Sequence, residues 1–190
     1  MASNRLIAVV GMPFSGKGEV VSYLVEYMRF EKVYFGGTVL RVLDEKGLPH
    51  TQEHEKPLRE QLRRDHGPAA MALLNLEEIE AKLKLGDTVI DGLYSWAEYL
   101  FLKERFPQMI VMAVWAPPEL RYDRAAKRPD RALSREDAIA RDHAQLENLQ
   151  TGGPIAMADV VVNNTGELAN LHQFLKCWAT DNWEVIQFYR

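Results

Sequence analysis

Two glycines and a lysine at a fixed spacing are the residues of this chain most suited to chemistry. The segment Gly11-Met-Pro-Phe-Ser-Gly16-Lys17-Gly18 matches the pattern Gly-x4-Gly-Lys, between an apolar run over 6–10 and apolar residues at helical spacing up to 28. The backbone N–H groups of such a loop turn inward onto an anion, and the next helix adds its positive end. The lysine adds a mobile positive charge. We expect these residues to bind the nucleotide: Gly11, Pro13, Ser15, Gly16, Lys17, Gly18 and Glu19. A simple glycine turn with a surface lysine is the alternative.

A carboxylate is the next candidate. Gly18 and Glu19 follow Lys17, so the hydroxyl that normally touches Mg²⁺ at this point of the motif is absent. Asp91 ends the apolar run 88–91, and ligands of open parallel sheets bind at the carboxyl ends of strands. We predict that Asp91 takes a catalytic role by holding Mg²⁺, usually through water. An aspartate that caps the next turn is the alternative.

Seven basic residues crowd the stretch 121–141. They are Arg121, Arg124, Lys127, Arg128, Arg131, Arg135 and Arg141. Arginines on a closing lid can stabilise the charge of a transferring phosphoryl group. We assign this catalytic role to Arg128, Arg131 and Arg141, and the alternative is a solvated helix face balanced by the nearby acids.

The acceptor side is predicted from a second basic stretch. Gly36-Gly37 could form an anion-binding nest, and Arg41 follows at the start of a helical insert, where it could clamp an acceptor phosphate. Arg59, Arg63 and Arg64 are further candidates in that insert, of which we choose Arg63. A charged outer helix face is the competing interpretation.

Strands and helices alternate along the chain and set the frame for these residues. The predicted strands cover 5–10, 32–35, 88–91, 109–115 and 158–163, and predicted helices fill most of the remainder. Alternation of this kind indicates a parallel sheet of about five strands with helices on both faces, a three-layer α/β/α sandwich of the P-loop NTPase type. We expect one domain over 1–190: a core of 1–37 and 87–190, a helical acceptor insert over about 38–86, and a short lid over about 127–135.

Composition limits the function classes. The chain has 190 residues, 47% hydrophobic and 26% charged, with a net charge of −4, which argues against a nucleic-acid partner. The single cysteine, Cys177, is typical of a reducing cytoplasm, and no apolar run approaches the ~20 residues of a membrane helix. The aromatic tail Trp178, Trp183, Phe188 and Tyr189 either packs on the sheet or forms a dimer surface, so both a monomer and a homodimer are open.

The chain resembles the P-loop small-molecule kinases over nearly its full length, in particular adenylate-kinase-related proteins and dephospho-CoA kinases. In the front half, the segments 11–18, 34–41 and 89–92 resemble those of nucleoside monophosphate kinases. The resemblance implies an acceptor-phosphate role for Arg41 and places Asp91 near Mg²⁺. In the back half, 128–141 and 158–166 are similar to the lid and last strand of dephospho-CoA kinases, which implies that Asn163 lies beside the adenine of ATP.

Two departures from these families bear on the acceptor. Adenylate-type kinases carry an arginine just after the Asp-Gly pair, but this chain reads Asp91-Gly-Leu-Tyr94, so Tyr94 becomes the substrate-binding candidate. Dephospho-CoA kinases have a strand-end aspartate where Gly36-Gly37-Thr38 stands here. The resemblance implies ATP- and Mg²⁺-dependent phosphoryl transfer to a small nucleotide-like acceptor. The alternatives are an ATP-binding switch with little turnover and a nucleic-acid 5′-end kinase.

Overall fold

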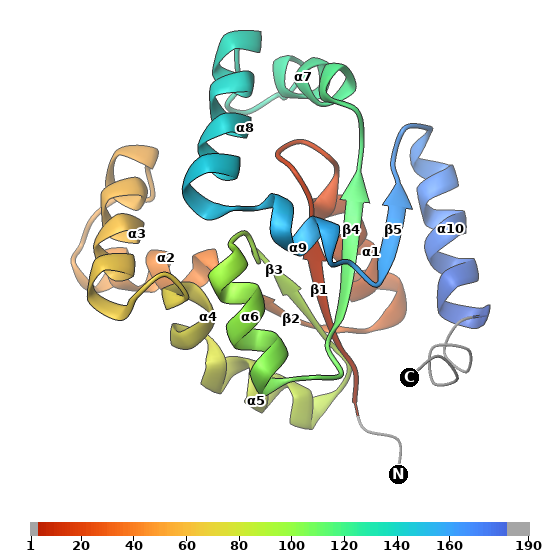
Figure 1. Cartoon of the computed structure of the whole chain (residues 1–190), viewed down its shortest axis with the longest axis horizontal. Helices are drawn as coiled ribbons and strands as arrows, with labels where there is room; N and C mark the ends of the chain where they lie inside the picture. Colours follow the sequence, from red (N-terminus) through yellow and green to blue (C-terminus); the bar gives the residue numbers. More distant parts are fainter. Residues whose placement is uncertain (1–3, 182–190) are drawn as a thin grey trace.

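A five-stranded, all-parallel sheet forms the centre of the computed structural model, which describes residues 4–181 (Figure 1). The strands are β1 (Leu6–Val10), β2 (Glu31–Tyr34), β3 (Thr88–Asp91), β4 (Ile110–Trp115) and β5 (Val160–Asn163), in the order β2-β3-β1-β4-β5. All four strand pairs are parallel. The predicted α/β class and the five parallel strands are therefore confirmed.

Ten helices connect and follow these strands within the described chain. They are α1 (Lys17–Met28), α2 (Gly36–Glu45), α3 (Gln52–His66), α4 (Ala70–Leu74), α5 (Leu76–Leu85), α6 (Trp96–Arg105), α7 (Pro118–Ala126), α8 (Arg135–Leu149), α9 (Gly152–Ala156) and α10 (Leu168–Asp181). The long connection between β2 and β3 is wholly helical, as predicted.

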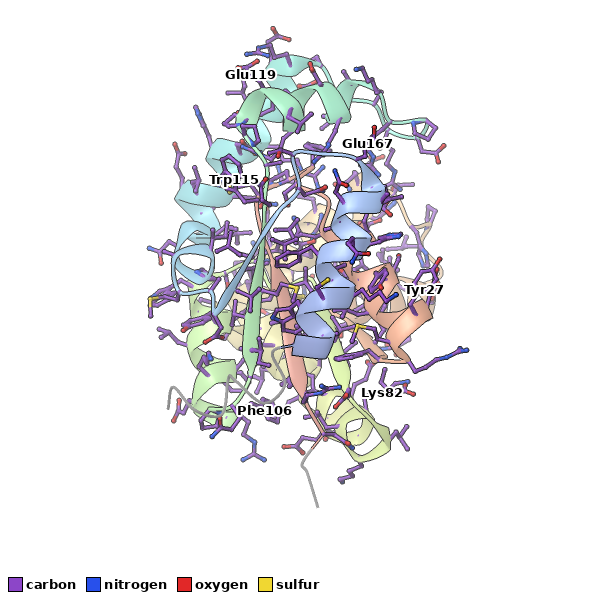
Figure 2. All side chains as sticks on the ribbon, turned by 90° about the vertical axis from the view of Figure 1, so that its right-hand side faces the viewer. Tyr27, Lys82, Phe106, Trp115, Glu119 and Glu167 are labelled. Carbon is purple, nitrogen blue, oxygen red and sulfur yellow. The ribbon has the colours of Figure 1, made fainter. Side chains whose placement is uncertain are left out.

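Both faces of the sheet are covered, and β1 shows why. Leu6, Ala8 and Val10 belong to one buried cluster, whereas Ile7 and Val9 belong to the other. Side chains alternate across a strand, so a strand that is apolar at every position needs a core on each side. Helices α1 and α10 lie side by side over one face (Figure 2), and α2, α4, α5 and α6 supply residues to the cluster on the opposite face.

Two predicted elements differ from the structure. From its sequence, the stretch after Gly67-Pro68 predicts one long helix to about Leu85, but the structure interrupts it at Asn75. The buried side chain of Asn75 donates to Met71 O at 2.7 Å and accepts from the Thr38 hydroxyl at 3.0 Å. An asparagine that bonds its own backbone competes with the helix ladder. The run Gly152-Gly153-Pro154 predicts a turn from its sequence, but in the structure it belongs to the short helix α9. Gly153 lies so close to Trp96 there that a Cβ would meet the indole at 2.6 Å.

The carboxyl ends of the strands face α7 and α8, and the loop after β1 lies beneath these helices (Figure 1). Helix α3 stands on the other side of the same edge, next to α2 and α4. Ligands of parallel sheets bind at this edge. Trp178 is buried in the α10 face, whereas Trp183, Phe188 and Tyr189 lie outside the described residues. No helix over residues 4–181 is long and apolar enough to cross a membrane.

Candidate active site

The loop between β1 and α1 depends on glycine at two places. Gly11 and Gly16 have φ values of 146° and 99°, a region that favours glycine. A Cβ on Gly11 would meet Val114 O at 2.5 Å, and one on Gly16 would meet Asn164 Nδ2 at 2.0 Å. Gly18 has open space, with nothing within 4 Å of a Cβ. The first two glycines are therefore required by backbone conformation and close packing, whereas Gly18 is not.

Lys17 begins α1 and folds back over the loop. Its Nζ donates to Gly11 O at 2.8 Å and to Met12 O at 2.9 Å, and it lies 5.7 Å from the centre of the Tyr94 ring. Burial lowers its pKa to about 8, Asp91 opposes this shift, and Arg141 and Arg121 add to it. An ammonium that is desolvated and held only by carbonyl oxygens gains strongly from an anion placed in the loop.

Two side chains brace the loop from its outer side. Asn164 Nδ2 donates to Ser15 O at 2.8 Å, and Arg124 donates to Ser15 O at 3.3 Å and to Asn164 O at 2.8 Å. The sequence prediction named Asn163, which is exposed and lies outside the pocket lining, whereas Asn164 is buried and lines it. Successive side chains near a strand end point to opposite sides, so a displacement of one residue decides which asparagine reaches the loop.

Helices α7 and α8 are joined by a buried ion pair. Arg121 forms a bidentate pair with Asp142 at 2.7 and 2.8 Å, and both side chains are almost fully buried. Arg121 also donates to Pro13 O at 3.1 Å, and the Tyr122 hydroxyl donates to Asp142 at 3.0 Å. Arg121 thus connects α7, α8 and the phosphate loop, and its N–H donors serve the fold.

The other arginines of the stretch 121–141 differ in whether their N–H donors already bond a neighbouring residue. Arg135 forms a bidentate pair with Glu119 at 2.6 Å. Over residues 4–181, Arg128, Arg131 and Arg141 have no hydrogen bond or ion pair, and the same holds for Arg59 on α3. Desolvation lowers the pKa of Arg141, and the positive charges of Arg59, Arg128 and Arg131 lower it further, while Tyr94 opposes them. Unpaired arginines that repel one another are suited to hold a polyanion.

Asp91 lies at the end of β3, on the pocket wall. It forms an ion pair with Lys32 at 2.8 Å. Tyr94 lines the pocket beside it, and burial raises the pKa of the Tyr94 hydroxyl to about 12, with Asp91 adding to the shift. The pairing of Asp91 with Lys32, on the neighbouring strand β2, was not predicted from the sequence.

These residues surround one pocket of about 630 Å³. Its lining includes Pro13, Phe14, Gly16, Lys17, Gly18, Glu19, Asp91, Tyr94, Arg124, Arg128, Arg141, Gln145, Asn164, Gly166 and Leu168. Gly11 and Ser15 shape the loop from inside, without lining the pocket. Gln145 was missed by sequence reasoning, although it follows Arg141 by one helical turn, a spacing that places both on one face. Its Oε1 atom is buried with no hydrogen-bond partner, so it can accept from a ligand.

The predicted acceptor residues do not all reach this pocket. Gly37 lies in the first turn of α2, and Arg41 donates to Glu78 at 3.0 Å and to Thr38 at 2.9 Å. Arg63 lies on α3 with its Nε atom buried and unbonded, near the fully buried Glu98, whose Oε1 is also unbonded. Of the four predicted residues, Tyr94 alone lines the described pocket.

Comparison with known proteins agrees with this architecture. Residues 7–141 match the family AAA_18, described as an AAA domain. A UPF0200 protein of Thermococcus sibiricus is 34% identical over 168 residues, which covers 86% of this chain and 87% of the relative. Two solved structures share the fold. A shikimate kinase from Acinetobacter baumannii in complex with shikimate has a TM-score of 0.60, 19% identity, and 95% of each chain covered. A gluconokinase from Sinorhizobium meliloti has a TM-score of 0.59, 15% identity, and 99% and 98% covered.

The resemblance to P-loop small-molecule kinases, expected from the sequence, is confirmed for the fold, and the families that the comparisons show are AAA_18 and UPF0200. At these identities the two solved structures establish the fold alone.

Proposed function

Because this chain belongs to the AAA_18 domain family and to the UPF0200 proteins, we propose that it catalyses ATP-dependent phosphoryl transfer to a small anionic acceptor. One observation carries the proposal. A glycine-bounded loop with its lysine lines the same pocket as Arg128 and Arg141, two arginines that form no hydrogen bond or ion pair over residues 4–181. A site that only bound nucleotide through the loop would have no need of further uncompensated positive charge.

The residues of the chain take distinct roles in this proposal. The amides of the loop, the N-terminal end of α1 and Lys17 bind the β- and γ-phosphates of ATP. Arg128, Arg131 and Arg141 stabilise the negative charge that spreads over the transferring group, with their in-plane N–H donors directed at its oxygens. Asn164 and Arg124 hold the loop in shape. In-line transfer between oxygens needs little covalent help from the protein, so positioning and electrostatics carry the rate.

The donor set suits Mg²⁺ held mainly by the nucleotide. Within residues 4–181, no three His, Cys, Asp or Glu side chains gather as a metal site, and Asp91 is the carboxylate on this wall of the pocket. Mg²⁺ commonly keeps several waters and is held by one or two carboxylates plus substrate phosphates, so Asp91 alone is a sufficient protein contribution. When bound, Mg²⁺ neutralises charge on the β- and γ-phosphates. Lys32, which pairs with Asp91, would have to release it.

The acceptor enters from the side of the helical insert. We propose that residues 38–86 cover it and that 127–135 form the lid. Arg59 lies close enough to Tyr34, Tyr94 and Arg141 to influence the pKa of each, so it joins Arg63 and Gly37 as a candidate for an anionic group of the acceptor. Arg41 could take this role only if it released Glu78 and Thr38. A nucleoside monophosphate offers one phosphate that an arginine can hold and that accepts the phosphoryl group, whereas dephospho-CoA offers a hydroxyl acceptor and a separate diphosphate to be held.

Acceptor-dependent release of ADP tests the proposal. The protein is incubated with ATP, Mg²⁺ and single members of a panel of nucleoside monophosphates, dephospho-CoA and small anionic polyols. We expect at least one acceptor to accelerate ADP formation. No stimulation by any member, with ATP bound tightly, would instead favour a nucleotide-binding switch. Two observations favour that second candidate: the missing hydroxyl at Gly18 and the missing arginine after Gly92.

A matched pair of arginine variants tests the assigned roles. Arg141→Ala should lower turnover about 10- to 100-fold with a smaller effect on ATP affinity, because the charge it stabilises develops during transfer. Arg135→Ala removes the same charge from the same helix, but the donors of Arg135 are already occupied by Glu119. It should therefore change turnover less than about twofold. Equal effects of the two variants would refute the distinction.

A further inference from the structure

Phe14 occupies an unusual place in the phosphate loop. Its backbone φ is 62°, in the left-handed region that a bulky side chain rarely adopts. Such strain persists only where the surroundings compensate for it, and it clusters at functional sites. A glycine at this position would adopt the same conformation without cost. The side chain of Phe14 therefore needs an explanation beyond the shape of the loop.

Two arginines, Arg128 and Arg141, lie against the Phe14 ring. The guanidinium carbon of Arg128, in the segment after α7, lies 5.9 Å from the ring centre, and that of Arg141, on α8, lies 5.6 Å away. Both distances fall within the range of a cation–π attraction. Over residues 4–181, neither arginine has an ion pair or hydrogen bond. The ring is therefore the contact that ties these two arginines to the phosphate loop.

A contact with an aromatic ring leaves the N–H donors of a guanidinium available, whereas an ion pair occupies them. Attraction to a π face requires none of the in-plane N–H donors of a guanidinium, which remain free for a phosphate. Arg135 provides the contrast. It also lies over a ring, that of Tyr122 at 5.3 Å, but its donors are occupied by the carboxylate of Glu119. Tyr122 itself donates to Asp142 and supports the fold.

We propose that Phe14 is a positioning residue whose ring seats Arg128 and Arg141 over the phosphate loop with their N–H donors free. The inference rests on the proposed function, because the seated arginines are those assigned to the transferring group. The seat also explains how two like charges are kept at one place before the anion arrives, since the ring attracts both. A carboxylate could hold them equally well, but it would occupy their donors and repel the phosphates.

The first test does not depend on catalysis. In protein labelled with ¹⁵N-arginine, the Nε–Hε signals of Arg128 and Arg141, assigned with Arg128→Lys and Arg141→Lys, should be shifted by the ring current. Phe14→Leu removes the ring and should move both signals. Phe174→Leu makes the same exchange on the exposed side of α10 and should move neither. If the Nε–Hε signals of both arginines stay in place in Phe14→Leu, the proposed contact with the ring is refuted.

The second test separates positioning from binding. Phe14→Leu should lower kcat about tenfold with little change in the KM for ATP, and Phe14→Tyr, which keeps a ring, should restore turnover. Phe14→Gly also removes the ring, and it relieves the strain of the left-handed backbone at this position. It therefore allows turnover without the ring to be measured if Phe14→Leu folds poorly. A rise in KM alone, or full turnover in Phe14→Gly, would refute the proposal.

A parent protein that turns over no acceptor would refute the proposed function, but the effect of Phe14 on the two arginines could still be measured. In that case the readout is the tightening of ADP binding by aluminium fluoride, a mimic of the transferring group. Phe14→Leu should lose most of this tightening while its affinity for ADP alone is kept. If aluminium fluoride tightens ADP binding in Phe14→Leu as much as in the parent, the inference is refuted, whatever the outcome for the acceptor.

Discussion

Replacing Lys17 with methionine should stabilise the nucleotide-free protein at neutral pH while it abolishes phosphoryl transfer. Burial lowers the pKa of Lys17 from 10.5 to about 8, so the folded state pays a penalty for the charged form. A pKa lowered by roughly 2.5 corresponds to about 3 kcal/mol, an upper bound because the side chain faces a pocket that water can enter. Methionine removes this charge and has a similar length.

Two lost hydrogen bonds offset part of the gain. Lys17 donates to Gly11 O and Met12 O, and each bond contributes about 1 kcal/mol. We therefore expect Lys17→Met to raise the free energy of unfolding by about 1 kcal/mol at pH 7.

The dependence on pH provides the sharper measurement. Between about pH 8 and 10.5 the unfolded parent binds a proton at Lys17 that the folded parent does not, so the stability of the parent rises with pH over this window. Lys17→Met lacks this rise. The difference between the two proteins should therefore swing by roughly 2–3 kcal/mol from pH 7 to pH 10, and the variant should become the less stable one.

Urea denaturation of both proteins at several pH values, followed by tryptophan fluorescence, measures this difference, and all groups that titrate alike in both proteins cancel. Lys46→Met, at an exposed position after α2, controls for the loss of one positive charge. A difference that is constant with pH would refute the assignment of a desolvated lysine. In the same preparation, formation of ADP should fall about 100-fold or more, a loss of roughly 3 kcal/mol of transition-state stabilisation.

Four further substitutions test the site and its support. Gly16→Ala should weaken ATP binding at least about tenfold, because its backbone is left-handed and its Cβ would meet the Asn164 amide nitrogen at 2.0 Å. Gly18→Ala has open space around its Cβ and should bind ATP as tightly as the parent does. Calorimetry measures both affinities. Arg121→Ala should lower the free energy of unfolding by about 3–5 kcal/mol, since it leaves the buried carboxylate of Asp142 unpaired, and a loss below about 1 kcal/mol would contradict a structural role. Burial raises the pKa of the Glu98 carboxyl above its value in the unfolded chain, so this group makes the free energy of unfolding fall as pH rises above that unfolded value. Glu98→Gln should remove this fall in denaturation curves measured at several pH values. An unchanged pH profile would speak against a buried carboxyl.

Local sequence was sufficient for the loop and the sheet. The segment from Gly11 to Gly18 uses residues whose chemistry acts through the backbone next to them, so strand, loop and helix follow from a short pattern. The strands were predictable because β1 is apolar at every position, which favours burial on both faces. Interruption of the helical insert at Asn75 was not predictable, because it depends on Thr38, 37 residues away in the chain.

The arginines of the stretch 121–141 show where tertiary structure decides. Helical spacing places Arg121, Arg124 and Arg128 on one face, and nothing in that spacing distinguishes them. Their roles differ because their partners come from distant segments: Asp142 for Arg121, and Ser15 and Asn164 for Arg124.

The sequence by itself thus determined that a glycine-bounded loop with a lysine stands at the carboxyl edge of a parallel sheet, together with a stretch rich in arginine over 121–141. The tertiary structure alone decided which of the basic side chains remain available, because a guanidinium whose donors are taken by a carboxylate or carbonyl cannot also hold a phosphate. It also assigned a position to Phe14, a residue that carries no charge and attracts attention only when the guanidinium groups of Arg128 and Arg141 are found 5.9 and 5.6 Å from its ring centre.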